Sequence, residues 1–408
     1  MPVGIEKINL YAGRFYLDIA ELAQVRGLDS RYVAENLMCK ARSVYPVYED
    51  AITLAVNAAK KLLLSQDLED IELLIVGTES AVDMGKPIST WVHRFCNLSH
   101  NCRNFEIKHA CYGGTAALKM AAFWVASGIR PGKKALVIST DFSSTQIDNK
   151  YEAISGGSAV AMLVSNNPQI LELELGKAGY WTNEISDNLR PNSRVEVVTT
   201  EMSFYSYMDA LEGAYSHYIQ LNGNNPVNYE ADFKKHIYHA PFPGMTFQAH
   251  RTMLNRLHTV DKVTAKSKFE EKVAESLHFA QVIGSSYGSS TFIGLLSLLN
   301  YASDLQPKDR ISLFAYGGGC QGEFYSGLIG STAREKICSL NINQHLNQRI
   351  RLSVEEYEIN ELTREKYINT STYKPERNLS ESYEKLYENQ GFLVLKQVED
   401  FYREYEWS

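Results

Sequence analysis

Apolar and polar positions along this chain follow two periods, one typical of helices and one typical of buried strands. Short apolar runs predict strands at 73–76, 135–138, 158–164, 236–239, 311–315 and 324–329. Apolar residues at helical spacing predict helices at 49–64, 90–97, 247–257 and 288–299. Strands and helices therefore alternate, which indicates a layered α/β fold.

The order of these elements divides the chain into two similar parts. We expect residues 1–166 to form an N-terminal α/β half and residues 229–408 to form a C-terminal α/β half. The polar, tyrosine-rich segment 167–228 between them is expected to be irregular and to cap the functional site. A chain of 408 residues is long enough for two such units.

Composition narrows the class of protein. A hydrophobic content of 44% and a charged content of 22% are typical of a soluble globular enzyme, and a net charge of −7 argues against a nucleic-acid partner. We see neither a basic and apolar leader nor an apolar stretch of membrane-spanning length, so a cytoplasmic protein without membrane association is expected. The six cysteines form no C-x-x-C pair, which argues against zinc and disulfides.

One cysteine is a candidate nucleophile. Cys111 stands before the apolar run 118–126, and we expect it in the first turn of a buried helix, where the N-terminal backbone N–H groups favour a thiolate. Gly113 and Gly114 are expected to leave room for a substrate beside the sulfur. A structural cysteine next to a glycine turn is the alternative interpretation.

Three other segments carry residues that complement a cysteine. Glu79 closes an expected strand, His239 lies in an apolar stretch, and the turn Gly317–Gly319 follows another strand. Together they can supply a base, an imidazole and backbone N–H groups for nucleophilic chemistry. Individually, a strand-end carboxylate is often only solvated and a histidine in an apolar stretch is often a core residue.

These segments, in this order and spacing, resemble one known family. Thr78–Ser80, Ala110–Tyr112, His239–Phe242, Tyr316–Gly317 and Glu323–Tyr325 are similar to the 3-hydroxy-3-methylglutaryl (HMG) thioester synthases, the HMG-CoA synthase family of the thiolase superfamily. The segments 243–245, 249–251 and 400–407 resemble the polyketide β-branching branch of that family.

The resemblance implies a fold and a set of catalytic roles. The fold would be thiolase-like, with two pseudo-duplicated α/β halves in a five-layer αβαβα arrangement. Cys111 would carry an acetyl group, Glu79 would remove a proton from its methyl, and His239 would hydrogen-bond the ketone of the acceptor. The turn Gly317–Gly319 and the N–H of Cys111 would stabilise the thioester oxygen.

The resemblance also implies binding residues and partners. The expected substrate-binding residues are Asp83, Asp141, Asp187, Ser285, Tyr316 and Gly318. Ser285 and Gly318 depart from the family, which usually has asparagine and serine there. No metal or organic cofactor is expected, because the substrate thioesters themselves carry phosphopantetheine or coenzyme A. The expected partners are donor and acceptor acyl carrier proteins, small acyl thioesters and, through the strand at 105–107, a second copy of the chain.

The predicted activity is condensation of acetyl-cysteine with a β-ketoacyl thioester on a carrier protein. The alternative is an HMG-CoA synthase of the mevalonate pathway that acts on acetyl-CoA and acetoacetyl-CoA. Phe247 and Gln248 are neutral where the coenzyme A enzymes tend to offer lysines to the nucleotide phosphates, which favours the carrier-dependent activity. A non-enzymatic binder is a third possibility, and the presence of both Glu79 and Cys111 argues against it.

Overall fold

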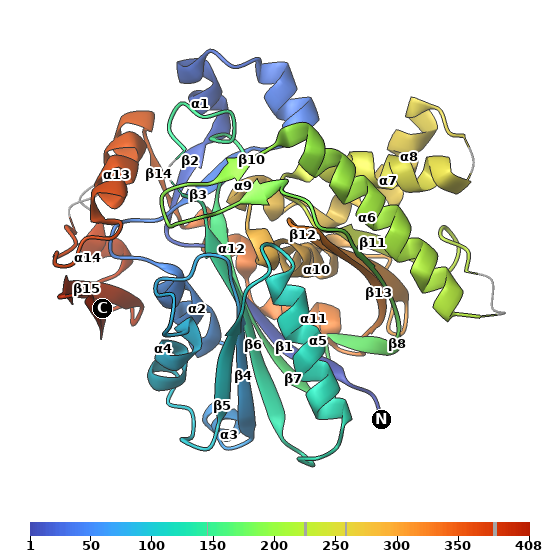
Figure 1. The fold of residues 1–408 in the computed structure, drawn as a ribbon, viewed down its shortest axis with the longest axis horizontal. Coiled ribbons are helices and arrows are strands. Elements are labelled where there is room, and N and C mark those ends of the chain that lie inside the picture. Colours follow the sequence, from blue (N-terminus) through green and yellow to red (C-terminus); the bar gives the residue numbers. More distant parts are fainter. Residues whose placement is uncertain (145, 224–226, 258, 378–381) are drawn as a thin grey trace.

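The computed structural model describes residues 1–144, 146–223, 227–257, 259–377 and 382–408 (Figure 1). In these residues the main sheet has the strand order β11-β12-β13-β8-β1-β7-β6-β4-β5. Its strands are β1 (Gly4–Tyr11), β4 (Ile71–Gly77), β5 (Arg103–Ile107), β6 (Lys134–Phe142), β7 (Gly157–Ser165), β8 (Leu171–Thr182), β11 (Lys235–Tyr238), β12 (Arg310–Gly317) and β13 (Gln321–Ile329).

Smaller elements surround this sheet. The short strands are β2 (Phe15–Asp18), β3 (Ala41–Val44), β9 (Asn188–Leu189), β10 (Val197–Val198), β14 (Ile350–Leu352), β15 (Leu393–Glu399) and β16 (Tyr402–Trp407). The α-helices are α1 (Ile19–Arg26), α2 (Ala51–Lys60), α3 (Ser65–Leu68), α4 (Ile88–Phe95), α5 (Gly113–Ala126), α6 (Thr200–Leu221), α7 (Pro243–Leu257), α8 (Lys262–Lys272), α9 (Ala280–Ile283), α10 (Ser290–Tyr301), α11 (Ala333–Ser339), α12 (Ile342–Asn347), α13 (Val354–Tyr367) and α14 (Tyr383–Leu386). A π-helix spans Tyr32–Leu37, and 3-10 turns span Ala274–Ser276 and Tyr287–Ser289.

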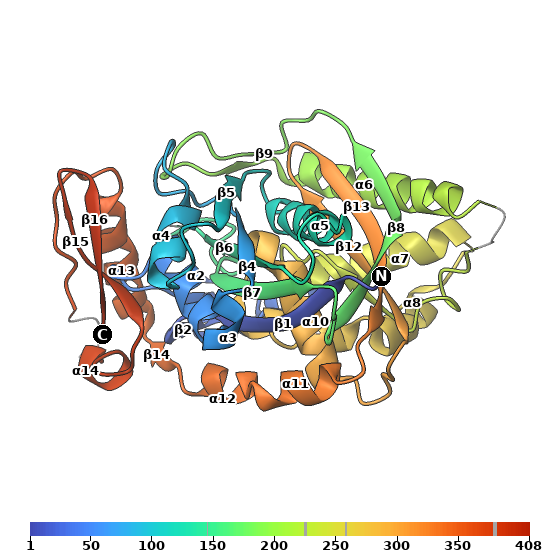
Figure 2. The same ribbon diagram turned by 90° about the horizontal axis from the view of Figure 1, so that it is seen from below.

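Three hydrophobic cores arrange these elements in layers. The first lies between α2, α4 and the N-terminal strands, and the second surrounds α5 and α10 between the N-terminal and C-terminal strands. The third lies between the C-terminal strands and the outer helices α6 and α7. The sequence of layers is therefore helix, sheet, helix, sheet, helix, as Figures 1 and 2 show. None of the helices in the described residues is both long and apolar enough to cross a membrane.

The two halves repeat one pattern. In each, a helix of the middle layer leads into an antiparallel strand pair: α5 into β6 and β7, and α10 into β12 and β13. The halves join through a short pairing of β1 with β8, so their strands form a continuous sheet. The mixed α/β fold expected from the sequence is confirmed.

The expectation of an irregular segment over 167–228 is wrong for most of its length. Strand β8 and the long helix α6 occupy much of this segment. Leu171 and Leu173 alternate with polar residues in β8, and α6 buries Tyr207, Leu211 and Tyr218 on one face. Tyr207, Tyr215 and Tyr218 of α6 are therefore core residues, whereas Tyr205 is exposed. Only the part around β9 and β10 is a short hairpin; residues 224–226 lie outside the described residues.

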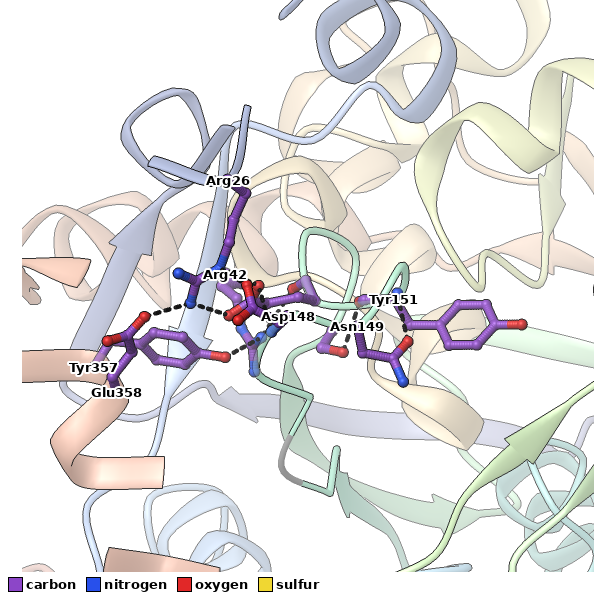
Figure 3. A network of polar contacts seen from close by, with 9 residues as sticks. Arg26, Arg42, Asp148, Asn149, Tyr151, Tyr357 and Glu358 are labelled. Atoms are coloured by element: carbon purple, nitrogen blue, oxygen red, sulfur yellow. Dashed lines mark hydrogen bonds and ion pairs between the residues drawn. The ribbon is translucent and has the colours of Figure 1, made fainter. Parts of the chain in front are cut away.

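A largely buried polar network holds Glu152, in the connection between β6 and β7. Arg26 on α1 donates two hydrogen bonds to the Glu152 carboxylate, at 2.8 and 3.0 Å, and a third at 2.6 Å to Glu358 on α13. Arg42 on β3 donates to the Glu152 carbonyl oxygen at 2.8 Å and to the Tyr357 hydroxyl at 3.1 Å. Figure 3 shows Arg26 and Arg42 between α13, which carries Tyr357 and Glu358, and this connection. The two arginines therefore hold the connection against a helix that is remote from it in sequence.

Candidate active site

The structure brings Cys111 and Glu79 into contact. Strands β4 and β5 are parallel neighbours, and Glu79 follows β4 as Cys111 follows β5, so both side chains lie at the same edge of the sheet. The Cys111 Sγ donates a hydrogen bond to Glu79 Oε2 at 3.6 Å. Both residues are intermediate between buried and exposed, while their thiol and carboxyl groups are desolvated by the surrounding protein.

The charge state of Cys111 differs from the sequence-based expectation. The cysteine precedes α5 rather than lying in its first turn, since the helix begins at Gly113. Burial and the negative Glu79 nearby raise the pKa of the Cys111 thiol well above its ordinary value. The pKa of the Cys111 thiol is therefore shifted in the opposite direction from the one expected at a helix N-terminus, and the thiol donates to Glu79.

The glycines after Cys111 also have a different purpose. A Cβ at Gly114 would lie 2.7 Å from the Ser139 hydroxyl and 2.9 Å from the Gly288 carbonyl oxygen. A Cβ at Gly113 would lie 3.2 Å from the Ile107 carbonyl oxygen. These contacts are to protein atoms, so the glycines let the start of α5 pack closely on the sheet rather than make room for a substrate.

Asp141, at the end of β6, organises the turn that carries Glu79. Its Oδ1 accepts hydrogen bonds from the Thr78 hydroxyl at 2.9 Å, the Glu79 N–H at 2.8 Å and the Ser80 hydroxyl at 2.9 Å. Asp141 is fully buried, and burial raises its pKa. Burial, followed by the Asp141 charge, also raises the pKa of Glu79. The expected site residue Asp141 therefore holds the turn that carries Glu79 and raises the pKa of its carboxyl group.

A hairpin from the capping segment reaches the same cluster. The pairing of Leu189 with Val197 places Arg190 and Glu196 at the two ends of the loop that connects β9 with β10. Arg190 Nη1 donates to the Ser80 hydroxyl at 3.2 Å. The Glu196 carboxylate accepts from the Tyr287 hydroxyl at 3.1 and 3.2 Å and from the Ser144 hydroxyl at 3.2 Å. Ser144 belongs to the connection between β6 and β7 that the Arg26 network holds.

His239 directly follows β11 and is buried. Its Nδ1 is 2.6 Å from the Ser290 Oγ, and that oxygen also accepts the Ala240 N–H at 3.2 Å. The Ser290 hydroxyl can therefore donate its own proton to Nδ1, and in that arrangement the proton of the neutral ring is on Nε2. Burial lowers the pKa of His239 to about 3, so the imidazole is neutral and can donate from Nε2.

One set of contacts links His239 to the backbone of Cys111, and a second links it to Tyr316, just before the glycine-rich turn. The 3-10 turn Tyr287–Ser289 leads to Ser290, and a Cβ at Gly288 would lie 3.2 Å from the Cys111 carbonyl oxygen. On the other side, the Tyr207 ring stacks on His239 with centroids 6.3 Å apart and packs against Tyr316 at 5.2 Å. These contacts join the segment of His239 to those of Cys111 and Tyr316, and Glu79 contacts Cys111 directly.

The glycine-rich turn is held by Asp187, which is fully buried. Asp187 accepts the Tyr316 hydroxyl at 2.7 Å and the Gly319 N–H at 2.9 Å. Gly319 is thus not available to a substrate oxygen. Within the part of the chain that the structure describes, the N–H groups of Gly318 and Cys111 donate to no protein acceptor, so these two remain for the expected oxyanion contact.

The remaining expected binding residues, Gly318, Ser285 and Asp83, lie in three different environments. A Cβ at Gly318 would lie 2.9 Å from the Cβ of Asn188, so this turn has no space for a serine unless Asn188 moves. Ser285 is partly exposed and its N–H donates to the Ile154 carbonyl oxygen at 2.8 Å. Asp83 is exposed, accepts from the N–H groups of Gly85 and Lys86, and does not join the buried cluster.

Sequence reasoning overlooked several residues of this site. Arg190 and Glu196 stand in a polar stretch with no periodicity, and Ser290 lies far along the chain from His239. No local pattern marks them, because their roles arise from contacts between distant segments. Across the described ranges, no group of three or more His, Cys, Asp or Glu side chains is arranged to hold a metal ion.

Comparison with known proteins adds independent information. Residues 1–169 match the description "Hydroxymethylglutaryl-coenzyme A synthase N terminal", and residues 251–407 match its C-terminal counterpart. The chain is 36% identical to the polyketide biosynthesis 3-hydroxy-3-methylglutaryl-ACP synthase PksG of Bacillus subtilis, over 100% of this chain and 99% of that protein. It is 31% identical to the hydroxymethylglutaryl-CoA synthase of Enterococcus faecalis, over 88% and 91% of the two chains. The crystal structure of the curacin biosynthetic pathway HMG synthase in complex with acetyl donor-ACP superposes with a TM-score of 0.94 and 37% identity, covering 100% of both chains.

Proposed function

This chain belongs to the hydroxymethylglutaryl-coenzyme A synthase family, and from that premise we propose that it installs β-branches on polyketides bound to an acyl carrier protein. In this reaction an acetyl group on Cys111 condenses with a β-ketoacyl thioester. The full-length similarity to PksG and to the curacin enzyme supports this assignment, and the family match confirms the thiolase-like fold. The observation that carries the mechanism is the contact between Cys111 Sγ and Glu79 Oε2.

Acetyl transfer comes first. The Glu79 carboxylate takes the thiol proton as the sulfur attacks the donor thioester carbonyl. The bond between the acetyl carbon and the carrier sulfur breaks, and the carrier sulfur leaves with the proton that Glu79 took from Cys111, which returns Glu79 to its carboxylate form. The N–H groups of Gly318 and Cys111 stabilise the oxyanion that forms on the way.

Condensation follows. The Glu79 carboxylate removes a proton from the acetyl methyl, and the resulting enolate carbon attacks the acceptor ketone to form a carbon–carbon bond. The Nε2–H of neutral His239 donates to the ketone oxygen as it becomes an alkoxide, which then takes up a proton. Water cleaves the thioester to Cys111 and releases the product. Each of these steps uses protein groups and thioester chemistry alone.

The alternative is the same chemistry on coenzyme A esters. The E. faecalis relative named as an HMG-CoA synthase supports it at lower identity and coverage than PksG. Phe247 and Gln248 on α7 offer no positive charge to a nucleotide phosphate, which favours the carrier protein.

We further propose a homodimer that forms at β5. This strand is an edge of the main sheet, paired only with β4 among the described residues. Exposed apolar side chains lie on β5, α5 and β8: Phe105, Met120, Phe123, Tyr180 and Trp181. An unpaired edge beside apolar side chains is a favourable surface for a second copy.

Intact-mass spectrometry tests the assignment. The purified protein is incubated with acetyl-loaded carrier protein from a β-branching pathway or with acetyl-coenzyme A, and the mass of the peptide containing Cys111 is followed. Faster acetylation by the carrier, followed by product formation with a β-ketoacyl carrier, supports the proposal. Equal rates from coenzyme A and carrier would favour the alternative, and no acetylation from either would refute both.

A further inference from the structure

The β9–β10 hairpin carries a charged pair into the polar cluster beside Glu79. Its register sets Arg190 immediately after β9 and Glu196 immediately before β10, so one hairpin delivers both side chains. The hairpin is anchored by the Thr199 N–H, which donates to the Asp187 carbonyl oxygen at 2.9 Å. The hairpin therefore connects the turn at Gly319, through Asp187, with the cluster at Glu79.

Arg190 is connected to Glu79 by hydrogen bonds through two side chains, those of Ser80 and Asp141. Arg190 Nη1 donates to the Ser80 hydroxyl, that hydroxyl donates to Asp141 Oδ1, and the same oxygen accepts the Glu79 N–H. The guanidinium is thus hydrogen-bonded to the turn that holds the base. Replacing it would change the charge near Glu79 without removing any group that touches the reacting atoms.

Carboxyl groups outnumber cations around Glu79. Three carboxyl groups, those of Glu79, Asp141 and Glu196, gather with one cation, Arg190, and with the neutral Cys111 thiol and Tyr287 hydroxyl. Burial, Asp141 and Glu196 raise the pKa of Glu79, whereas Arg190 lowers it. Arg190 and Glu196 therefore act on the base in opposite directions.

We propose that Arg190 is a positioning residue that keeps the Glu79 carboxylate charged and ready to accept a proton, and that Glu196 has the opposite effect on Glu79. This inference rests on the proposed function, in which Glu79 removes the methyl proton of acetyl-Cys111. The pair sets the pH range in which the enolate forms. A general base must be ionised to act, so the cation determines how much of the enzyme is active at neutral pH.

The test measures proton exchange on acetyl-Cys111. Wild type and variants are loaded with S-acetyl-phosphopantetheine in deuterated buffer, and deuterium in the acetyl group is followed by mass spectrometry across pH. Arg190→Gln is expected to move the midpoint of the exchange profile up by about one pH unit, which is about tenfold slower exchange below the midpoint. Glu196→Gln is expected to move the midpoint down.

A control on the same hairpin separates charge from folding. Arg194 is exposed and donates to the Ile368 carbonyl oxygen at 2.9 Å, and Arg194→Gln should leave the midpoint unchanged. An unchanged midpoint in Arg190→Gln, or an upward shift in Glu196→Gln, would overturn the inference. If Arg190→Gln fails to fold, the direction of the Glu196→Gln shift decides alone. Wild-type enzyme that takes up no acetyl group, or no deuterium, would instead refute the proposed function.

Discussion

Replacing Ser290 by alanine should slow the carbon–carbon bond-forming step and spare the earlier ones. The Ser290 hydroxyl is 2.6 Å from His239 Nδ1, and both residues are buried, with exposures of 3% and 2%. Without the hydroxyl, Nδ1 has no donor and the ring can take the tautomer that carries its proton there. Nε2 would then face the acceptor ketone as a lone pair, which cannot stabilise an alkoxide.

The magnitude follows from the loss of one buried hydrogen bond. A buried polar atom left without its partner costs about 1–3 kcal/mol. If that cost appears in the transition state of condensation, the step slows by about 5- to 150-fold, because each ~1.4 kcal/mol is a factor of ten. Acetyl transfer and methyl proton exchange involve Cys111 and Glu79, so neither should change.

Single-turnover kinetics with acetyl-loaded enzyme separates these steps. Acetylation, deuterium uptake and product formation are each measured by mass spectrometry in wild type and Ser290→Ala. The matched control is Ser289→Ala, whose hydroxyl donates to the Ser139 carbonyl oxygen at 2.9 Å and does not touch His239. Condensation at the wild-type rate, or equal slowing of exchange and condensation in Ser290→Ala, would refute the assigned tautomer and the role of Ser290.

Four further outcomes are expected. Cys111→Ser should keep the fold and lose acetylation, because a hydroxyl is far less acidic than a thiol; a mass shift on the peptide at the wild-type rate would contradict this. Glu79→Gln, once loaded with acetyl, should exchange methyl protons about 10²–10⁴-fold more slowly, and exchange at the normal rate would point to another base. Burial raises the pKa of Glu49 from 4.5 to about 7, so its neutral form favours the folded state below 4.5 and this contribution is lost as pH rises to 7. In urea unfolding, the free energy of unfolding should therefore fall by ~3 kcal/mol less between pH 5 and pH 8 in Glu49→Gln than in wild type. The same pH dependence in both proteins would exclude this role of Glu49. Phe105→Glu should weaken the homodimer in sedimentation, and a wild-type monomer at micromolar concentration would exclude the β5 interface.

Much of the fold was predictable because its strands are local apolar patterns. The runs at 135–138 and 311–315 lie within β6 and β12, and the helical spacing at 247–257 lies within α7. The segment 167–228 was misjudged because tyrosine serves equally as core and as surface. Only packing against β8 and β13 decides which role each tyrosine of α6 has.

The sequence by itself determined the alternation of strands and helices, the family resemblance, and the identity of Cys111, Glu79 and His239 as candidates, because these depend on residue type and local order. Only the tertiary structure decided their chemical state. Burial and the neighbouring carboxylate raise the pKa of the Cys111 thiol, and Ser290, at the start of α10, hydrogen-bonds the Nδ1 of His239, which follows β11. Arg190 reaches Glu79 by way of Ser80, from a hairpin remote in sequence. Electrostatic interactions act through space, and the distances between these groups are set when the chain folds.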